Sequence, residues 1–362
     1  MNKKKILCFC LALGAFSAMM AQETLSLSQC LQMAVDNNLS LQKSRNEIAK
    51  GKYSISENQA KLLPQINAVA QLNDNFTPPV SVTDGSAYGK PYNVTKTLQY
   101  NASAGLQLQM PLYNQMVNTA IDIAKIADHL NQLSYEKARE DLIVQTAKMY
   151  YMAQNTAEQI RLVNDNIKRL EELYGITQAF YDNQMTLEVD VKRVKLNIEN
   201  LTVQRDNAIA MLDQQYTMLK YVIDYPANKQ IKVSEVNPGE IETVNASGLN
   251  TNLYELQLLE KKKELAQKQT QLAKDGYLPS VSLTGSLMYS AFTDKIEHWI
   301  HSGESNHWYG SNGIGIQLRV PVFDGFEKRS KIRRAKMEEE NARIGYEDAL
   351  KGMQANYMNA VS

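Results

Sequence analysis

Three histidines and two glutamates fall in one short polar segment, Glu297, His298, His301, Glu304 and His307. Imidazole and carboxylate groups are common zinc and copper ligands, so this segment is a candidate metal site. No helical or strand spacing preorganises the five side chains. The competing interpretation is an ordinary polar loop at the surface, which the lack of spacing favours.

The remaining reactive residue types form no catalytic pattern. The fourth histidine, His129, and the single cysteine after residue 21, Cys30, are both predicted to be plain helix residues. The sequence contains no Ser/His/Asp or Cys/His arrangement and no glycine loop that would cradle a phosphate. These observations argue against an enzyme, and they predict no cofactor.

The charges exclude one class of partner. Acidic and basic residues balance at 39 each, which leaves no electrostatic footprint for nucleic acid. A basic run at 328–334 is interpreted as a solvated helix face, with anionic lipid headgroups as the alternative. Arg205, at an otherwise apolar helix position, is expected either to pair with a buried acid or to extend to solvent.

The first 21 residues have the pattern of a signal peptide. Lys3, Lys4 and Lys5 precede an apolar stretch, and Ala21 is a small residue suited to cleavage. No later run of 18 or more apolar residues occurs, so any membrane span in this chain must come from strands.

Four segments alternate between apolar and polar residues, in two pairs that read as a duplication. Strands are predicted at 64–76 and 98–110, and again at 279–292 and 308–320. Each pair is bordered by prolines, Pro64 and Pro111 in the first copy and Pro279 and Pro321 in the second.

The alternating segments have the character of membrane strands. Their polar positions are rich in Gln, Asn and Ser and almost uncharged, which suits a water-filled lumen, and their length suits a tilted crossing. Aromatic residues gather at their ends and loops, as an interfacial girdle requires: Tyr88, Tyr92, Tyr289, Phe292, Trp299, Trp308 and Tyr309. A soluble sheet with one wet face is the alternative.

Four strands cannot close a barrel, and a membrane tolerates no open sheet edge. The chain is therefore expected to assemble with copies of itself. Two copies would give eight strands and a filled interior, whereas three would give twelve and an open lumen, which the polar faces favour.

Long helices are predicted around the strands, at 28–62, 113–224, 249–275 and 324–362. The region 113–224 is expected to be an antiparallel hairpin roughly 100 Å long, because apolar residues recur at spacings of three and four along both of its halves. Its turn is predicted at 182–184, with Asn183 in the left-handed conformation and Thr186 capping the returning helix. Residues 226–248 form a linker with at most a short strand at 231–233.

Several segments resemble the TolC family of outer-membrane efflux proteins over essentially all of the chain after the signal peptide. They are the opening helices (Leu25–Leu31 and Ala34–Leu39), Asn252–Leu256, the Leu-Pro and Met/Val-Pro borders of the strand pairs, and Gln184–Val191 at the hairpin tip. The resemblance implies a first structural repeat at 22–225 and a second, incomplete one at 249–362.

It also implies a mainly helical fold with membrane β-structure: a homotrimer with a twelve-stranded outer-membrane barrel that continues as a helical tunnel through the periplasm of a Gram-negative bacterium. Such channels are passive exit ducts of tripartite efflux or type I secretion systems. Their hairpin tip, here Asn183, Gln184, Met185 and Thr186, docks onto a periplasmic adaptor (membrane fusion) protein and an inner-membrane pump of the RND, ABC or MFS type.

Two departures from the family pattern stand out. The family usually has glycine where this chain has Gln184, and the second helical hairpin expected after residue 324 is not present. The latter leads to the expectation of a truncated reading frame. The alternative function is a barrel-anchored periplasmic coiled coil with a structural or adhesive role.

Overall fold

The computed structural model describes residues 23–235, 253–295 and 308–361. The signal-peptide prediction and the Glu297–His307 cluster lie outside these ranges. The chain divides into two compact units. Unit 1 contains residues up to 47 and 132–250, and unit 2 contains 48–131 and 251–360.

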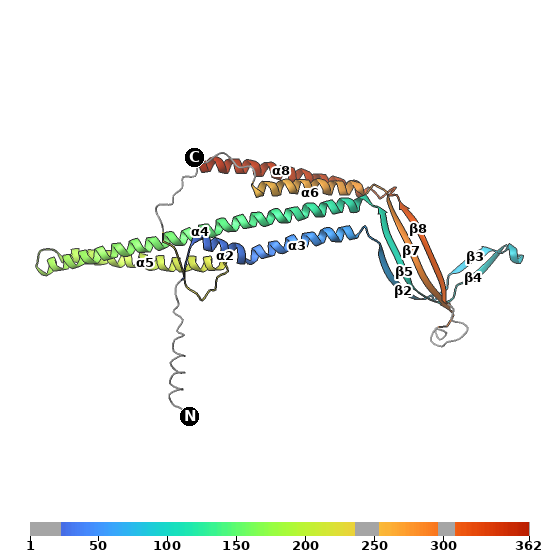
Figure 1. Cartoon of the computed structure of the whole chain (residues 1–362), viewed down its shortest axis with the longest axis horizontal. Helices are drawn as coiled ribbons and strands as arrows, with labels where there is room; N and C mark the ends of the chain where they lie inside the picture. Colours follow the sequence, from blue (N-terminus) through green and yellow to red (C-terminus); the bar gives the residue numbers. More distant parts are fainter. Residues whose placement is uncertain (1–22, 236–252, 296–307, 362) are drawn as a thin grey trace, which may run out of the picture. The chain divides into compact units, whose positions relative to one another are not determined.

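Unit 1 is built on a long helical hairpin. Its first arm is the part of helix α4 (Gln115–Asp182) from residue 132 onward. Its second arm is α5 (Glu188–Val222), which runs antiparallel beside α4 (Figure 1). The apolar residues predicted to recur at spacings of three and four along the hairpin form a seam: Ile167, Val191 and Leu219 are buried, whereas Leu187 at the turn is exposed. Arg205 pairs with its neighbour Asp206 at 2.8 Å in a partly exposed position, so the buried ion pair considered for it does not form.

The base of this hairpin carries a small sheet that joins distant parts of the chain. Strand β1 (Glu23–Leu25) pairs in parallel with β6 (Ile231–Val233), the short strand predicted in the linker. The Tyr150 hydroxyl donates to the Leu25 carbonyl and accepts from the Ser234 amide, both at 3.1 Å. This buried tyrosine thereby ties α4 to both strands.

The opening helices predicted within 28–62 are a pair, as the resemblance implies. Helix α2 (Leu27–Asn37) begins with a capping box in which Ser26 and Gln29 satisfy each other's backbone and side-chain groups. Asn38 interrupts it with an extended backbone, and α3 (Leu39–Ala60) follows. Cys30 lies fully buried on α2, as a plain helix residue.

Unit 2 contains a four-stranded antiparallel sheet in the order β2-β5-β7-β8. Its strands are β2 (Gln65–Asp74), β5 (Tyr100–Tyr113), β7 (Ser280–Thr293) and β8 (Trp308–Arg319). Helices α6 (Tyr254–Asp275) and α8 (Glu327–Val361) lead into β7 and out of β8, and they lie side by side, with Lys263 over the ring of Tyr346 (Figure 1).

A hairpin inserted between the first two sheet strands was not predicted. Strands β3 (Val80–Asp84) and β4 (Tyr92–Lys96) pair with each other around a turn with Gly89 at φ +68°. The 3₁₀ turn η1 (Ser86–Tyr88) connects them. No helix in the described part of the chain has the length and apolar character that a membrane crossing requires.

Candidate functional site

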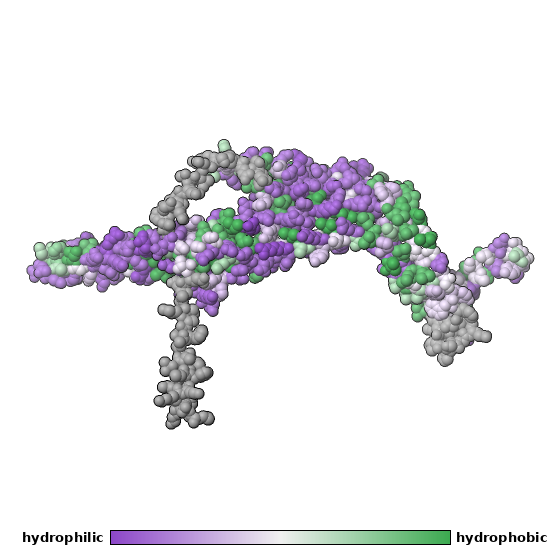
Figure 2. All heavy atoms as spheres, in the orientation of Figure 1, coloured by the Kyte–Doolittle hydropathy of each residue, from purple (hydrophilic) through white to green (hydrophobic). Residues whose placement is uncertain are grey.

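The register of the four-stranded sheet sorts its side chains into two contrasting faces. Paired residues share a face, so Ala68, Leu106 and Leu287 lie in one row and Ile66 and Leu108 in the next. This apolar face is exposed in the single chain: Leu106 is 45% exposed and Ile314 77%. Figure 2 shows the apolar surface over the sheet strands. A contiguous exposed apolar face on one chain indicates that something covers it.

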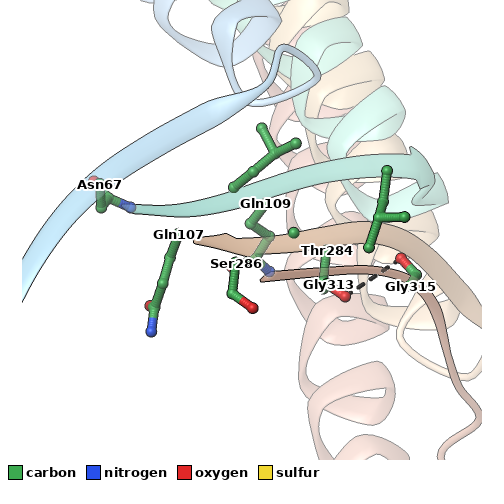
Figure 3. A pocket seen from close by; sticks show the side chains of 10 residues that line it. Asn67, Gln107, Gln109, Thr284, Ser286, Gly313 and Gly315 are labelled. Carbon is green, nitrogen blue, oxygen red and sulfur yellow. Dashed lines mark hydrogen bonds between the residues drawn. The ribbon is translucent and has the colours of Figure 1, made fainter. Parts of the chain in front are cut away.

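The opposite face is polar and almost uncharged. Asn67, Gln107 and Ser286 share a row, and Gln65, Gln109 and Thr284 share the next. All of these side chains except that of Gln65 line a hollow of about 480 Å³ (Figure 3), where the Thr284 hydroxyl donates to the Gly315 carbonyl at 3.3 Å. Amides, hydroxyls and glycines in this arrangement can hydrogen-bond water but hold no fixed charge.

Both edges of this sheet are open within the described residues. Strand β2 pairs only with β5, and β8 pairs only with β7. Each edge therefore presents unpaired backbone N–H and C=O groups, which are a template for pairing with another strand. In a hydrocarbon environment such edges would have to be closed.

The four border prolines do not all lie outside the strands. Pro64 and Pro279 directly precede β2 and β7, and Pro321 follows β8. Pro111, in contrast, lies inside β5 opposite Ser282, and the pairing shifts between Pro111 and Tyr113. The predicted end of this strand at residue 110 is therefore wrong. A bulge at Pro111 means that no ladder hydrogen bond needs the N–H that proline lacks, so the strand continues to Tyr113.

Aromatic residues flank the sheet as the sequence suggests. Tyr289, Phe292, Trp308 and Tyr309 lie toward the ends of β7 and β8 that meet the connecting loop, and each is at least 39% exposed. Tyr88 and Tyr92 belong to the inserted hairpin instead, and Trp299 lies outside the described residues.

The tip of the α4–α5 hairpin is a Schellman turn. The Met185 amide donates to the Phe180 carbonyl and the Gln184 amide to the Tyr181 carbonyl, at 2.8 and 2.9 Å. This pattern requires the left-handed conformation at Gln184, whose φ is 59°. Asn183 was predicted in that conformation, but it is the residue before it and uses its side chain to donate to the Ala179 carbonyl.

Thr186 does not cap the returning helix as predicted. Leu187 is the N-cap residue of α5 and offers no side-chain hydrogen bond. The Thr186 hydroxyl instead donates to the Asp190 carboxylate at 3.2 Å. Met185 is 74% and Leu187 69% exposed, so the tip presents apolar side chains to solvent.

The remaining candidate residues within the described ranges are His129 and the basic run at 328–334. The described residues hold no group of three or more His, Cys, Asp or Glu suited to a metal. His129 is exposed on α4. In the basic run, Lys328 pairs with Asp324, Lys331 with Glu327 and Arg334 with Glu338, as expected of a solvated helix face.

Comparisons with known proteins agree with this geometry. The chain is 23% identical to the outer membrane protein TolC of Escherichia coli (strain K12) over 335 residues, which cover 90% of this chain and 64% of that protein. It is 20% identical to the probable outer membrane lipoprotein SilC of Salmonella typhimurium, with 90% of this chain and 67% of that protein covered. The chain thus spans about two thirds of the length of these relatives.

Solved structures share the fold. The Campylobacter jejuni CmeC outer membrane channel superposes with a TM-score of 0.68 at 20% identity, over 90% of this chain and 68% of that one. The Vibrio cholerae outer membrane protein VceC gives 0.69 at 15% identity, over 90% and 75%. The family model described as outer membrane efflux protein matches residues 30–220 and 250–357. The chain belongs to the outer membrane efflux protein family.

Proposed function

We propose that the chain is the outer-membrane channel component of a tripartite efflux or type I secretion system. As a member of its family it is an outer-membrane protein that extends into the periplasm. In this role it is a passive duct rather than an enzyme, and the free energy for export comes from an inner-membrane pump of the RND, ABC or MFS type.

The four-stranded sheet is the observation that carries the proposal. One face is apolar and exposed, the other is polar and almost uncharged, and both edges are open within the described residues. A membrane barrel needs all three features, with lipid against the first face, water against the second and copies of the chain at the edges. Three copies give the twelve strands that leave an open lumen.

The helical hairpin supplies the second part of the proposal. Its predicted docking residues form the turn that joins the end of α4 to the start of α5: Asn183, Gln184, Met185 and Thr186. The exposed Met185 and Leu187 offer apolar contacts to the hairpin of a periplasmic adaptor protein. The two structural repeats, 22–225 and 249–362, joined by the linker 226–248, are part of the same proposal.

Two neighbouring residues of β5 test which face meets the lipid. Leu106→Arg places a charge on the apolar face, and the proposal predicts loss of the chain from the outer-membrane fraction, because arginine at the bilayer centre costs about 2–4 kcal/mol. Gln107→Arg places the same charge on the polar face. It is expected to leave the amount in the membrane unchanged and to shift ion selectivity in planar bilayers toward anions.

The opposite pattern would exclude the proposal. If Leu106→Arg inserts normally while Gln107→Arg does not, the assignment of the two faces is wrong. If both variants insert and the unmodified chain conducts no ions, the structural or adhesive coiled coil becomes the better account.

A further inference from the structure

A hollow on the side of the α4–α5 hairpin is lined mostly by methionine. It measures about 410 Å³, and its walls are Met149, Met152, Met211, Gln214, Gln215 and Met218. These four methionines are a large share of the 15 in the whole chain. The hollow lies within unit 1, on the part of the hairpin away from its tip.

Helix geometry lets several of the thioether groups reach one point. Met149 and Met152 are three residues apart on α4 and therefore neighbours on one face. Met211 and Met218 are two turns apart on α5 and face the same side, with about 10 Å between their positions along the axis. Methionine has three rotatable side-chain bonds, so the pair on α4 can be joined by at least one sulfur from α5.

Three of the four methionines are exposed, Met149 is partly buried, and no charged residue lines the hollow. Met152, Met211 and Met218 are 57%, 55% and 58% exposed. The only other lining groups are two neutral amides, and the side-chain oxygen of Gln215 is buried with no hydrogen-bond partner. The hollow therefore offers thioether sulfur and neutral amides, but no carboxylate or imidazole.

We propose that this methionine hollow binds a soft monovalent cation, Cu⁺ or Ag⁺. Thioether sulfur favours soft cations, whereas Zn²⁺ prefers imidazole, thiolate or carboxylate ligands and Mg²⁺ and Ca²⁺ prefer several carboxylate or carbonyl oxygens, more than the two amides of the hollow supply. Binding is coordination alone: it adds no bond to carbon and transfers no electron. The site depends on the arrangement of α4 and α5 and stands whether or not the channel function does.

Calorimetric titration of the full chain in detergent with Ag⁺, in chloride-free buffer, tests the site. The double variant Met149→Leu/Met152→Leu keeps the apolar volume and removes two sulfurs. Its Ag⁺ affinity should fall at least about tenfold. Removing a residue that only hydrogen-bonds to a metal ligand already costs about that much affinity, and here two ligands are removed. The control Met337→Leu/Met358→Leu, at exposed methionines of α8, should leave the affinity unchanged. Zn²⁺ should give no heat that depends on Met149 and Met152.

X-ray absorption at the silver edge provides a readout that misfolding cannot imitate. Sulfur neighbours should be seen in the parent and control proteins and be reduced in the hollow variant, with circular dichroism unchanged. Equal affinity in all three proteins, or a shell of oxygen and nitrogen alone in the parent, would overturn the proposal. So would resistance of the four methionines to peroxide in the metal-free protein, because another chain would then cover the hollow.

Discussion

At the scale of single residues, Gln184 holds a conformation that its side chain disfavours. The Schellman turn needs a left-handed residue there, and the family's usual glycine adopts that conformation without strain. Gln184→Gly is therefore expected to stabilise the tip by about 0.5–1 kcal/mol. Glycine removes the steric cost of the left-handed conformation, and this gain exceeds the extra conformational entropy that glycine loses on folding. Amide exchange at Met185 should slow accordingly.

A second glutamine gives the matched control for this change. Gln204 lies exposed inside α5, where glycine costs about 1 kcal/mol. Gln204→Gly should thus destabilise the same helix. Faster exchange at Met185 in the Gln184→Gly variant would show that the left-handed turn is not the native one.

The buried thiol of Cys30 predicts a pH dependence. Burial raises its pKa from 9.0 to about 11. Between these values the unfolded chain loses a proton that the folded chain keeps, so the free energy of unfolding falls as the pH rises. The parent protein should lose more stability from pH 9 to pH 11 than Cys30→Ala, as measured by urea unfolding. Parallel profiles for the two proteins would contradict the buried position.

At the scale of elements, the packing of β5 against β7 depends on Gly105. A Cβ there would fall against the Leu287 carbonyl oxygen and lie 2.6 Å from the Met288 sulfur. Gly313, on β8 and the same sheet face, has no atom within 4 Å of that position. Gly105→Ala should disrupt the sheet and lower the yield of folded protein in the outer membrane, whereas Gly313→Ala should have little effect. Similar yields from both would contradict this register.

Elements with a local signal could be predicted from the sequence. The period of two in β2, β5, β7 and β8 and the apolar seam of the helical hairpin both follow from which residues must be buried or exposed. The alternation of Val80 and Val82 also signals the β3–β4 hairpin, in which Val82 pairs with Val94, but the signal is short and stands among turn-forming residues.

Other features depend on distant partners or on position in a turn. Nothing near Glu23 shows that its strand pairs with Ile231, because that parallel pairing is made across more than 200 residues. Asn183 has the better left-handed propensity, yet the hydrogen bonds of the helix end impose that conformation on the next residue. Pro111 continues its strand because the bulge compensates for its missing N–H.

At the scale of the whole molecule, the central claim is that copies of the chain close the sheet. A sheet with an exposed apolar face and two open edges has no stable place in water or in lipid as a single copy. Closure through the edges of β2 and β8 would resolve both problems at once, because it would pair the backbone and turn every apolar face outward to lipid.

The mass of the intact complex, released from outer membranes in mild detergent and measured by native mass spectrometry, tests this claim most directly. We predict a complex of three chains that survives removal of lipid and conducts ions when returned to a bilayer. A single-chain mass for the membrane-extracted protein would contradict the account.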